Sequence, residues 1–147
     1  MQITKRADGA GLLQCIRDDG TRVWQKQPGR HAAHFALHDL THFAVETTLG
    51  CQNAFFGLVK QGWDMDDVTG KSARGPLPAE ATAVESIVGL LDAERAGGVL
   101  WTHEEFNQFS SARPLTQEEI GQIKARRGEL FGRWFALPAG ACLELEF

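Results

Sequence analysis

The stretch CIRDDGTRVW, residues 15–24, indicates a β-sheet near the start of the chain. Two runs of residues that favour strands flank Asp19-Gly20, a dipeptide that readily adopts the positive φ angles of a type I′ turn. This pattern predicts a β-hairpin with apolar side chains on both faces. With a turn at Asp19-Gly20, the cross-strand pairs are Ile16 with Val23 and Cys15 with Trp24.

The last residues of the chain, CLELEF (142–147), alternate strictly between apolar and acidic side chains after the cysteine. A period of two is typical of a half-buried antiparallel strand, and we expect this strand to close the sheet against the N-terminal hairpin. The residues between the two strand regions carry helical patterns. Helices are predicted over residues 78–98 and 116–135, over 102–109 and over 53–62, whereas residues 63–78 are predicted to form a long loop.

These elements predict a single α+β domain over residues 1–147. Its sheet is small and antiparallel, built from the N-terminal hairpin and the C-terminal strand, and four or five helices lie between them. A chain of 147 residues is long enough for one core of ordinary size and too short for two typical domains.

Composition and charge argue against several classes of function. The net charge of −4 gives no electrostatic reason to expect nucleic acid, whose binders usually carry a basic patch. No apolar stretch approaches the roughly 20 residues that span a bilayer, and the first residues lack a signal-peptide pattern, so we expect a cytoplasmic protein without a membrane segment. The three cysteines include no CxxC pair, and the chain has neither GxxxxGK[ST] nor GxGxxG.

The strongest functional signal is HFALHDLTHFAVE, residues 34–46, in which histidines recur at every fourth position and a glutamate follows. If residues 31–49 form one helix, steps of 100° divide their side chains between an apolar and a polar face. The apolar face carries Ala36, Leu37, Leu40, Phe43 and Ala44; the polar face carries His31, His38, Asp39, His42 and Glu46. The polar face is then either open to solvent or covered by another element.

A second interpretation of this stretch begins the helix later. Residues 28–37 are also compatible with an extended segment, in which case Asp39 is the N-cap and its carboxylate accepts from the first free backbone N–H groups. His38 then precedes the helix and His42 lies in its first turn. Under both interpretations these two histidines remain neighbours.

Helix geometry limits how this stretch can bind a metal ion. Residues four apart are neighbours on a helix, whereas residues eight apart are separated by about 12 Å of rise. The ligand pair is therefore His38 with His42, or His42 with Glu46, and a third ligand comes from elsewhere. Such a site suits Zn²⁺ or another first-row divalent metal acting on bound water in a small hydrolase. The candidates for the third ligand are His103, Glu80, Glu85, Glu104, Glu105, Asp64, Asp66 and Asp67.

Two metal-free interpretations stay open. In one, His38 and His42 carry out acid–base chemistry, with Asp39 or Glu46 as the orienting carboxylate of the catalytic site. In the other, the histidine helix is structural and the protein is a non-catalytic interaction domain that self-associates through aromatic surface residues. The alternatives differ in space, because a functional site needs a further polar group to converge on these imidazoles.

The block HDLTHFAVE (38–46), followed by FFGLV (55–59), resembles a group of small uncharacterised bacterial proteins with an HDLxH-aromatic-x-VE pattern and then an aromatic-glycine segment. The resemblance covers residues 37–62. It implies that His38, Asp39, His42 and Glu46 act as one unit, and it implies no particular substrate. His31, His34 and His103 lie outside the pattern.

Overall fold

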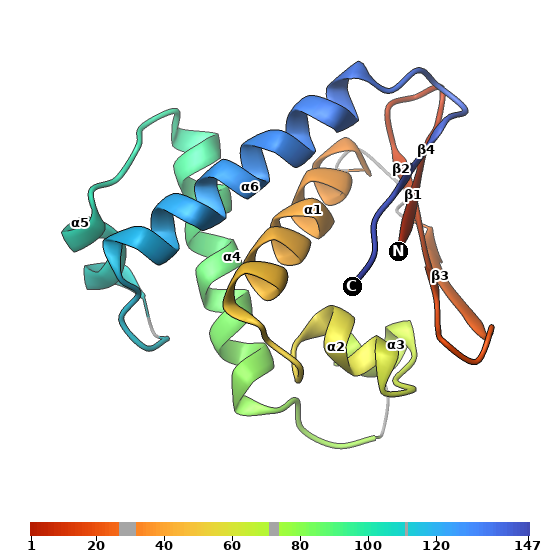
Figure 1. Cartoon of the computed structure of the whole chain (residues 1–147), viewed down its shortest axis with the longest axis horizontal. Helices are drawn as coiled ribbons and strands as arrows, with labels where there is room; N and C mark the ends of the chain where they lie inside the picture. The colour runs from red at the N-terminus through yellow and green to blue at the C-terminus, as the bar shows by residue number, and fades with distance from the viewer. Residues whose placement is uncertain (27–31, 71–73, 111) are drawn as a thin grey trace.

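The computed structural model describes residues 1–26, 32–70, 74–110 and 112–147. A four-stranded antiparallel sheet with the order β3-β2-β1-β4 lies at one edge of the molecule, and the helices pack beside it (Figure 1). The predicted α+β class is therefore confirmed. The strands are β1 (Gln2–Lys5), β2 (Gly11–Ile16), β3 (Arg22–Lys26) and β4 (Cys142–Glu144); the helices are α1 (Ala32–Leu49), α2 (Phe55–Lys60), α3 (Met65–Val68), α4 (Ala79–Gly97), α5 (His103–Phe109) and α6 (Gln117–Ala136).

One face of the sheet supplies a row of buried apolar side chains. Ile3 of β1 lies opposite both Leu13 of β2 and Leu143 of β4, and all three are buried. Because side chains alternate between the faces of a strand, this register directs the same face of three strands toward the helices. The C-terminal strand thus closes the sheet, as its alternation predicted.

The register of the hairpin differs by one residue from the prediction. Cys15 lies opposite Val23, and the loop contains three residues, Asp18, Asp19 and Gly20. A type I′ turn needs positive φ at both central residues, but here only Gly20 has it, at 82°. The Asp19 carboxylate instead accepts hydrogen bonds from the backbone and hydroxyl of Thr21, which favours the longer loop.

Two short elements were not predicted. The four-residue strand β1 was missed, although it pairs with both β2 and β4, because it is short and Ile3 is its one apolar residue. The single-turn helix α3 interrupts the predicted loop over 63–78 and is closed by a capping box between Asp64 and Asp67. With α3, the described residues hold six helices instead of four or five.

Helix α1 lies at the centre of the fold, between α4, α6, α2 and the sheet (Figure 1). Its described part begins at Ala32, so the interpretation with Asp39 as an N-cap is wrong. Residues 39–46 are all buried, and over this length the helix is covered on every side. Its apolar side chains contribute to two cores, one against the sheet and one against α4 and α5. The predicted polar face is therefore covered where His42 and Glu46 lie.

The three later helices form where their sequence signals place them. Thr102 and Thr116 cap α5 and α6 with side-chain bonds to Glu105 and Glu119, as their capping-box spacing predicted. Helix α4 ends at Gly98, which adopts the left-handed conformation with φ of 67°. Among the described residues, no helix is both long and apolar enough to cross a membrane.

Candidate metal centre

The polar side chains of α1 meet two carboxylates of α4. His34, His38 and His42 recur once per turn along α1, and Glu85 and Asp92 are two turns apart on α4. His42 pairs with Glu85 while His38 pairs with Asp92, so the two helices run in opposite directions past each other. The result is a continuous row of imidazoles and carboxylates along the interface between α1 and α4.

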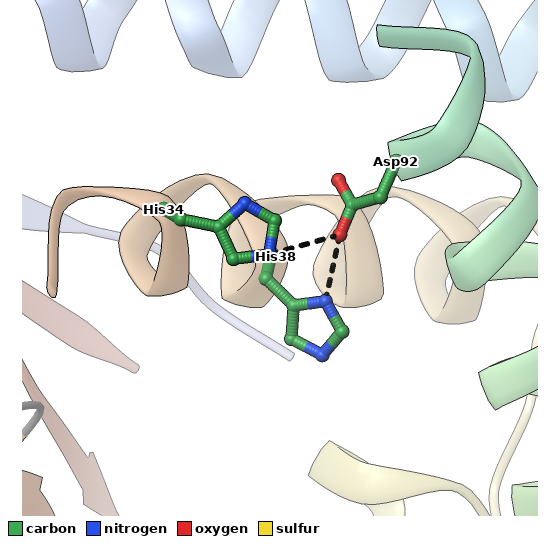
Figure 2. Close-up of side chains that lie close together, drawn as sticks. All are labelled: His34, His38 and Asp92. Carbon is green, nitrogen blue, oxygen red and sulfur yellow. Dashed lines mark hydrogen bonds and ion pairs between the residues drawn. The ribbon is translucent and has the colours of Figure 1, made fainter. Parts of the chain in front are cut away.

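The distances within this row are short. His38 Nδ1 lies 2.8 Å from Asp92 Oδ2, and His34 Nε2 lies 3.7 Å from the same oxygen (Figure 2). His42 Nε2 lies 3.3 Å from Glu85 Oε1. The rings of His38 and His42 are in edge contact, with centroids 4.8 Å apart. Figure 2 also shows that the second nitrogen of His38 points away from Asp92.

Glu46 holds His42 from the inner side. Its Oε1 lies 3.3 Å from His42 Nδ1, and its Oε2 accepts backbone N–H groups from Phe56, at 2.9 Å, and Gly57, at 3.4 Å. Those N–H groups belong to the first turn of α2, where they have no partner within the helix. Glu46 is fully buried, so these bonds compensate the cost of removing its carboxylate from water. The carboxylate fixes the orientation of the imidazole.

Arg95 occupies the other end of the row. Its Nη2 lies 2.7 Å from His34 Nδ1 and 3.3 Å from Asp92 Oδ1. A guanidinium can only donate hydrogen bonds, so His34 Nδ1 accepts and the proton of the neutral ring lies on Nε2. His34 therefore presents an N–H group toward Asp92.

Two sets of three side chains among the described residues have ligand atoms close enough to share one metal ion. One set is His34, His38 and Asp92; the other is His38, His42 and Glu85, and each set has its ligand atoms within 4.8 Å of one another. Two ligands around a tetrahedral ion with bonds of about 2.1 Å lie about 3.4 Å apart. The 3.3 Å between His42 Nε2 and Glu85 Oε1 already matches that separation. His42 is buried while the Glu85 side chain is 48% exposed, so the second set lies at the surface.

The flanking carboxylates govern the protonation of this row. Burial alone would lower the pKa of His42, but its hydrogen bonds with Glu46 and Glu85 raise it to about 9. The bond with His42 lowers the pKa of Glu85. Burial alone would raise the pKa of Asp92, and the hydrogen bond with His38 and the nearby positive charges reverse this and lower it. Near neutral pH, His42 therefore favours its protonated form, and Glu85 and Asp92 favour their ionised forms.

The structure brings only some of the predicted residues together. His38, His42 and Glu46 share one site with Glu85, whereas His103 belongs to neither ligand set, and its Nε2 bonds to the carbonyl of Leu115 at 2.8 Å. Asp39 is buried and belongs to neither ligand set. His31 lies outside the described residues. The remaining carboxylate candidates take part in neither set, and they are Glu80, Glu104, Glu105, Asp64, Asp66 and Asp67.

Two residues of the site were missed in the sequence. Asp92 and Arg95 follow Glu85 at intervals of seven and ten residues, and such intervals place all three near one face of a helix. This spacing was a usable signal, but it becomes informative only when the histidine helix is known to pack on that face.

No family model, no curated protein and no solved structure matches the chain.

Proposed function

We propose that the protein binds one divalent first-row transition metal ion, such as Zn²⁺, between α1 and α4 through His38, His42 and Glu85. The observation that carries this proposal is that each imidazole has a carboxylate on its Nδ1 side. Asp92 lies 2.8 Å from Nδ1 of His38, and Glu46 lies 3.3 Å from Nδ1 of His42. Metal-bound histidines typically donate their other N–H to such a carboxylate, which fixes the tautomer and makes the ligand nitrogen more basic.

This ligand set fits a cation better than the set with His34 does. When Arg95 donates to Nδ1 of His34, the Nε2 of that ring carries the proton and has no lone pair for a metal. Arg95 also places a positive charge on Asp92, 3.3 Å away. The set with Glu85 has no such cation in contact among the described residues, and the buried carboxylate of Glu46 lies behind it.

The exposure of the ligands supports chemistry at the bound ion. The side chains of Glu85 and His38 are 48% and 28% exposed, so an ion held there keeps a position for water. Three protein ligands and one open position are typical of catalytic zinc, which lowers the pKa of bound water and generates hydroxide near neutral pH. Hydrolysis of a small molecule is the reaction class that this arrangement supports best.

In this proposal, neither of the two predicted catalytic carboxylates, Glu46 and Asp39, contacts the substrate. Glu46 is fully buried and bonded to the first turn of α2, so it orients His42 and does not reach a substrate. Asp39 is only 5% exposed. Glu85 and Asp92 converge on the imidazoles, and this convergence favours a metal site over the interaction-domain hypothesis, which leaves the histidines uncovered.

Zinc binding by single variants tests the ligand set. The native chain, stripped with chelator, is titrated with Zn²⁺ in a calorimeter beside Glu85→Gln and His34→Ala, each of which changes only one of the two sets. We expect one equivalent of zinc in the native protein and in His34→Ala. Glu85→Gln should weaken binding more than the roughly tenfold to hundredfold loss seen for outer-shell carboxylates.

His103→Ala controls for binding by an unrelated exposed histidine, and it should leave the titration unchanged. Loss of binding in His34→Ala with retention in Glu85→Gln would transfer the site to Asp92. No zinc binding by the native chain would leave the row as a structural ion-pair network. If zinc binds, hydrolysis of p-nitrophenyl acetate and bis(p-nitrophenyl) phosphate is compared between the metal-loaded native protein and Glu85→Gln.

A further inference from the structure

A cavity lies beside Arg95, where the end of α4 and the loop after it meet α6 and Leu37 of α1. Its volume is about 500 Å³, within the range of small-molecule sites, which are typically about 300–1,000 Å³. We call it the α4–α6 groove. Its lining includes Arg95 and Arg127 together with Val99, Leu100 and Phe135.

The apolar wall of the groove is unusually open to solvent. Val99, Leu100 and Phe135 are 61%, 77% and 64% exposed, although single exposed apolar residues are the usual case on a soluble protein. They come from two different elements and line the same hollow. A concave cluster of this kind marks a binding surface more often than an isolated leucine does.

The floor of the groove carries more positive than negative charge. Lys124 and Arg127 both pair with Glu94, at 2.6 Å and 3.4 Å, so one carboxylate serves two cations. Arg95 adds a third cation at the rim, where it pairs with Asp92, so three cations face two carboxylates. This excess stands out in a chain whose net charge is −4.

Arg95 is also the cation best placed to meet a ligand. Its Nε and Nη2 are directed to Asp92 and His34, and within the described part of the chain its Nη1 has no hydrogen-bond partner. The side chain is 28% exposed. A guanidinium that is already fixed on one edge presents its remaining N–H groups without a large loss of side-chain entropy.

We propose that the α4–α6 groove binds a small amphipathic carboxylate, with the carboxylate on Nη1 of Arg95 and an aliphatic or aromatic body against Val99, Leu100 and Phe135. The excess of positive charge favours an anionic ligand, and the exposed apolar side chains favour a ligand with an apolar body. The volume of about 500 Å³ limits the ligand to a small molecule. This site does not depend on the metal. It shares only the contact of Arg95 with Asp92 and His34.

Octanoate and octan-1-ol test the proposal because they have the same chain and differ in charge. Each is titrated into the full chain in a calorimeter with EDTA present, so that the result is independent of metal binding. We expect octanoate to bind with one equivalent and about tenfold or more tightly than octan-1-ol, since a hydrogen-bonded charge contributes at least that factor. Arg95→Gln should remove most of this preference and leave the affinity for octan-1-ol unchanged.

Two further variants separate the parts of the groove. Leu100→Ser should weaken both ligands, and Arg133→Gln, which removes an exposed cation of α6 outside the groove lining, should change neither. Equal binding of octanoate and octan-1-ol, or an unchanged preference in Arg95→Gln, would overturn the proposal. Octanoate binding that fails in Arg133→Gln would instead indicate non-specific attraction to positive charge and would also overturn it.

Discussion

Helix α4 carries a polar cluster on each of two sides, and only one of the two clusters contains histidines. Toward α6, Glu94 is satisfied by Lys124, Arg127 and the backbone N–H of Trp101. Toward α1, Glu85 pairs with His42, and Asp92 pairs with His38 and, at the end of the row, with Arg95. Lysine and arginine stay protonated at ordinary pH, whereas a histidine can release its proton and offer a lone pair instead.

This difference separates a structural cluster from a candidate site. The Glu94 cluster is closed, because its carboxylate is 2% exposed and its cations have no second state to adopt. The histidine row is open at Glu85 and contains more carboxylates than one ion pair requires. Buried charge by itself therefore does not indicate a functional site. Histidines that can release a proton, beside a carboxylate that is open to solvent, are the better indication of one.

The largest effect on stability is expected at Glu94. Glu94→Ala leaves Lys124 and Arg127 without their shared carboxylate, and removal of one partner from a buried ion pair costs about 3–5 kcal/mol. Lys124 is partly exposed, so we expect the lower end of that range. Urea unfolding followed by circular dichroism measures the loss, and zinc binding by the folded variant should be unchanged. A loss below 1 kcal/mol, on the order of a surface pair, would contradict a closed structural cluster.

The next largest effect is expected at Gly57, which supports Glu46. A Cβ at this position would overlap the backbone carbonyl of Gln52, and the backbone cannot rotate away as a side chain can. Gly57→Ala should therefore cost about 2–3 kcal/mol, as overpacked core substitutions do. It should also weaken zinc binding, because the first turn of α2 holds Glu46.

Gly89→Ala is the matched control for this substitution. Gly89 lies on α4 between Glu85 and Asp92, and a Cβ there meets no atom within 4 Å. The same change should therefore stabilise the protein by up to about 1 kcal/mol through helix propensity. Equal effects of the two substitutions would show that the close approach at Gly57 does not constrain the fold.

The pH dependence of stability should reveal the histidine cluster in the metal-free protein. The pKa of His42 is raised from 6.5 to about 9, so its contribution is fully present below pH 6.5, declines above it and is lost as the pH rises through about 9. The expected loss is on the order of 3 kcal/mol. Urea unfolding in EDTA from pH 6 to pH 10 measures it, and His42→Gln should flatten the curve. A native curve as flat as that of the variant would mean that His42 is not protonated in the folded state.

The spacing of residues along the sequence predicted which side chains of α1 lie together in the candidate site. His38, His42 and Glu46 could be placed together because residues four apart are neighbours on any α-helix. Glu85 was one of several acidic candidates, and Asp92 was missed, because the choice among them depends on how α4 crosses α1. That crossing is set by apolar packing of side chains such as Val84 and Val88. The sequence of these residues does not specify which helix they pack against.

The sheet shows the same limit of local reasoning. The alternation of CLELEF predicted its strand, and Asp19-Gly20 predicted a hairpin. The loop length was not determined by that dipeptide, because Asp19 bonds to Thr21 and keeps a negative φ. The register therefore shifted by one residue. Strand β1 was missed because its four residues contain one apolar side chain, Ile3, which is too few to show an alternation.

The smallest effect on stability is expected at Glu85, where the effect on metal binding is expected to be largest. In EDTA, Glu85→Ala should cost less than about 1 kcal/mol, since half of this side chain is exposed and such pairs are screened by water. With free Zn²⁺ at about 100 times its dissociation constant, the native protein should gain about 2.7 kcal/mol by mass action, and the variant should gain almost none. Glu94→Ala should behave in the opposite way, with a large loss in EDTA and a full zinc response. If both variants instead lost stability equally in EDTA and both responded to zinc, the two sides of α4 would be equivalent, and the histidine row would be a second structural cluster.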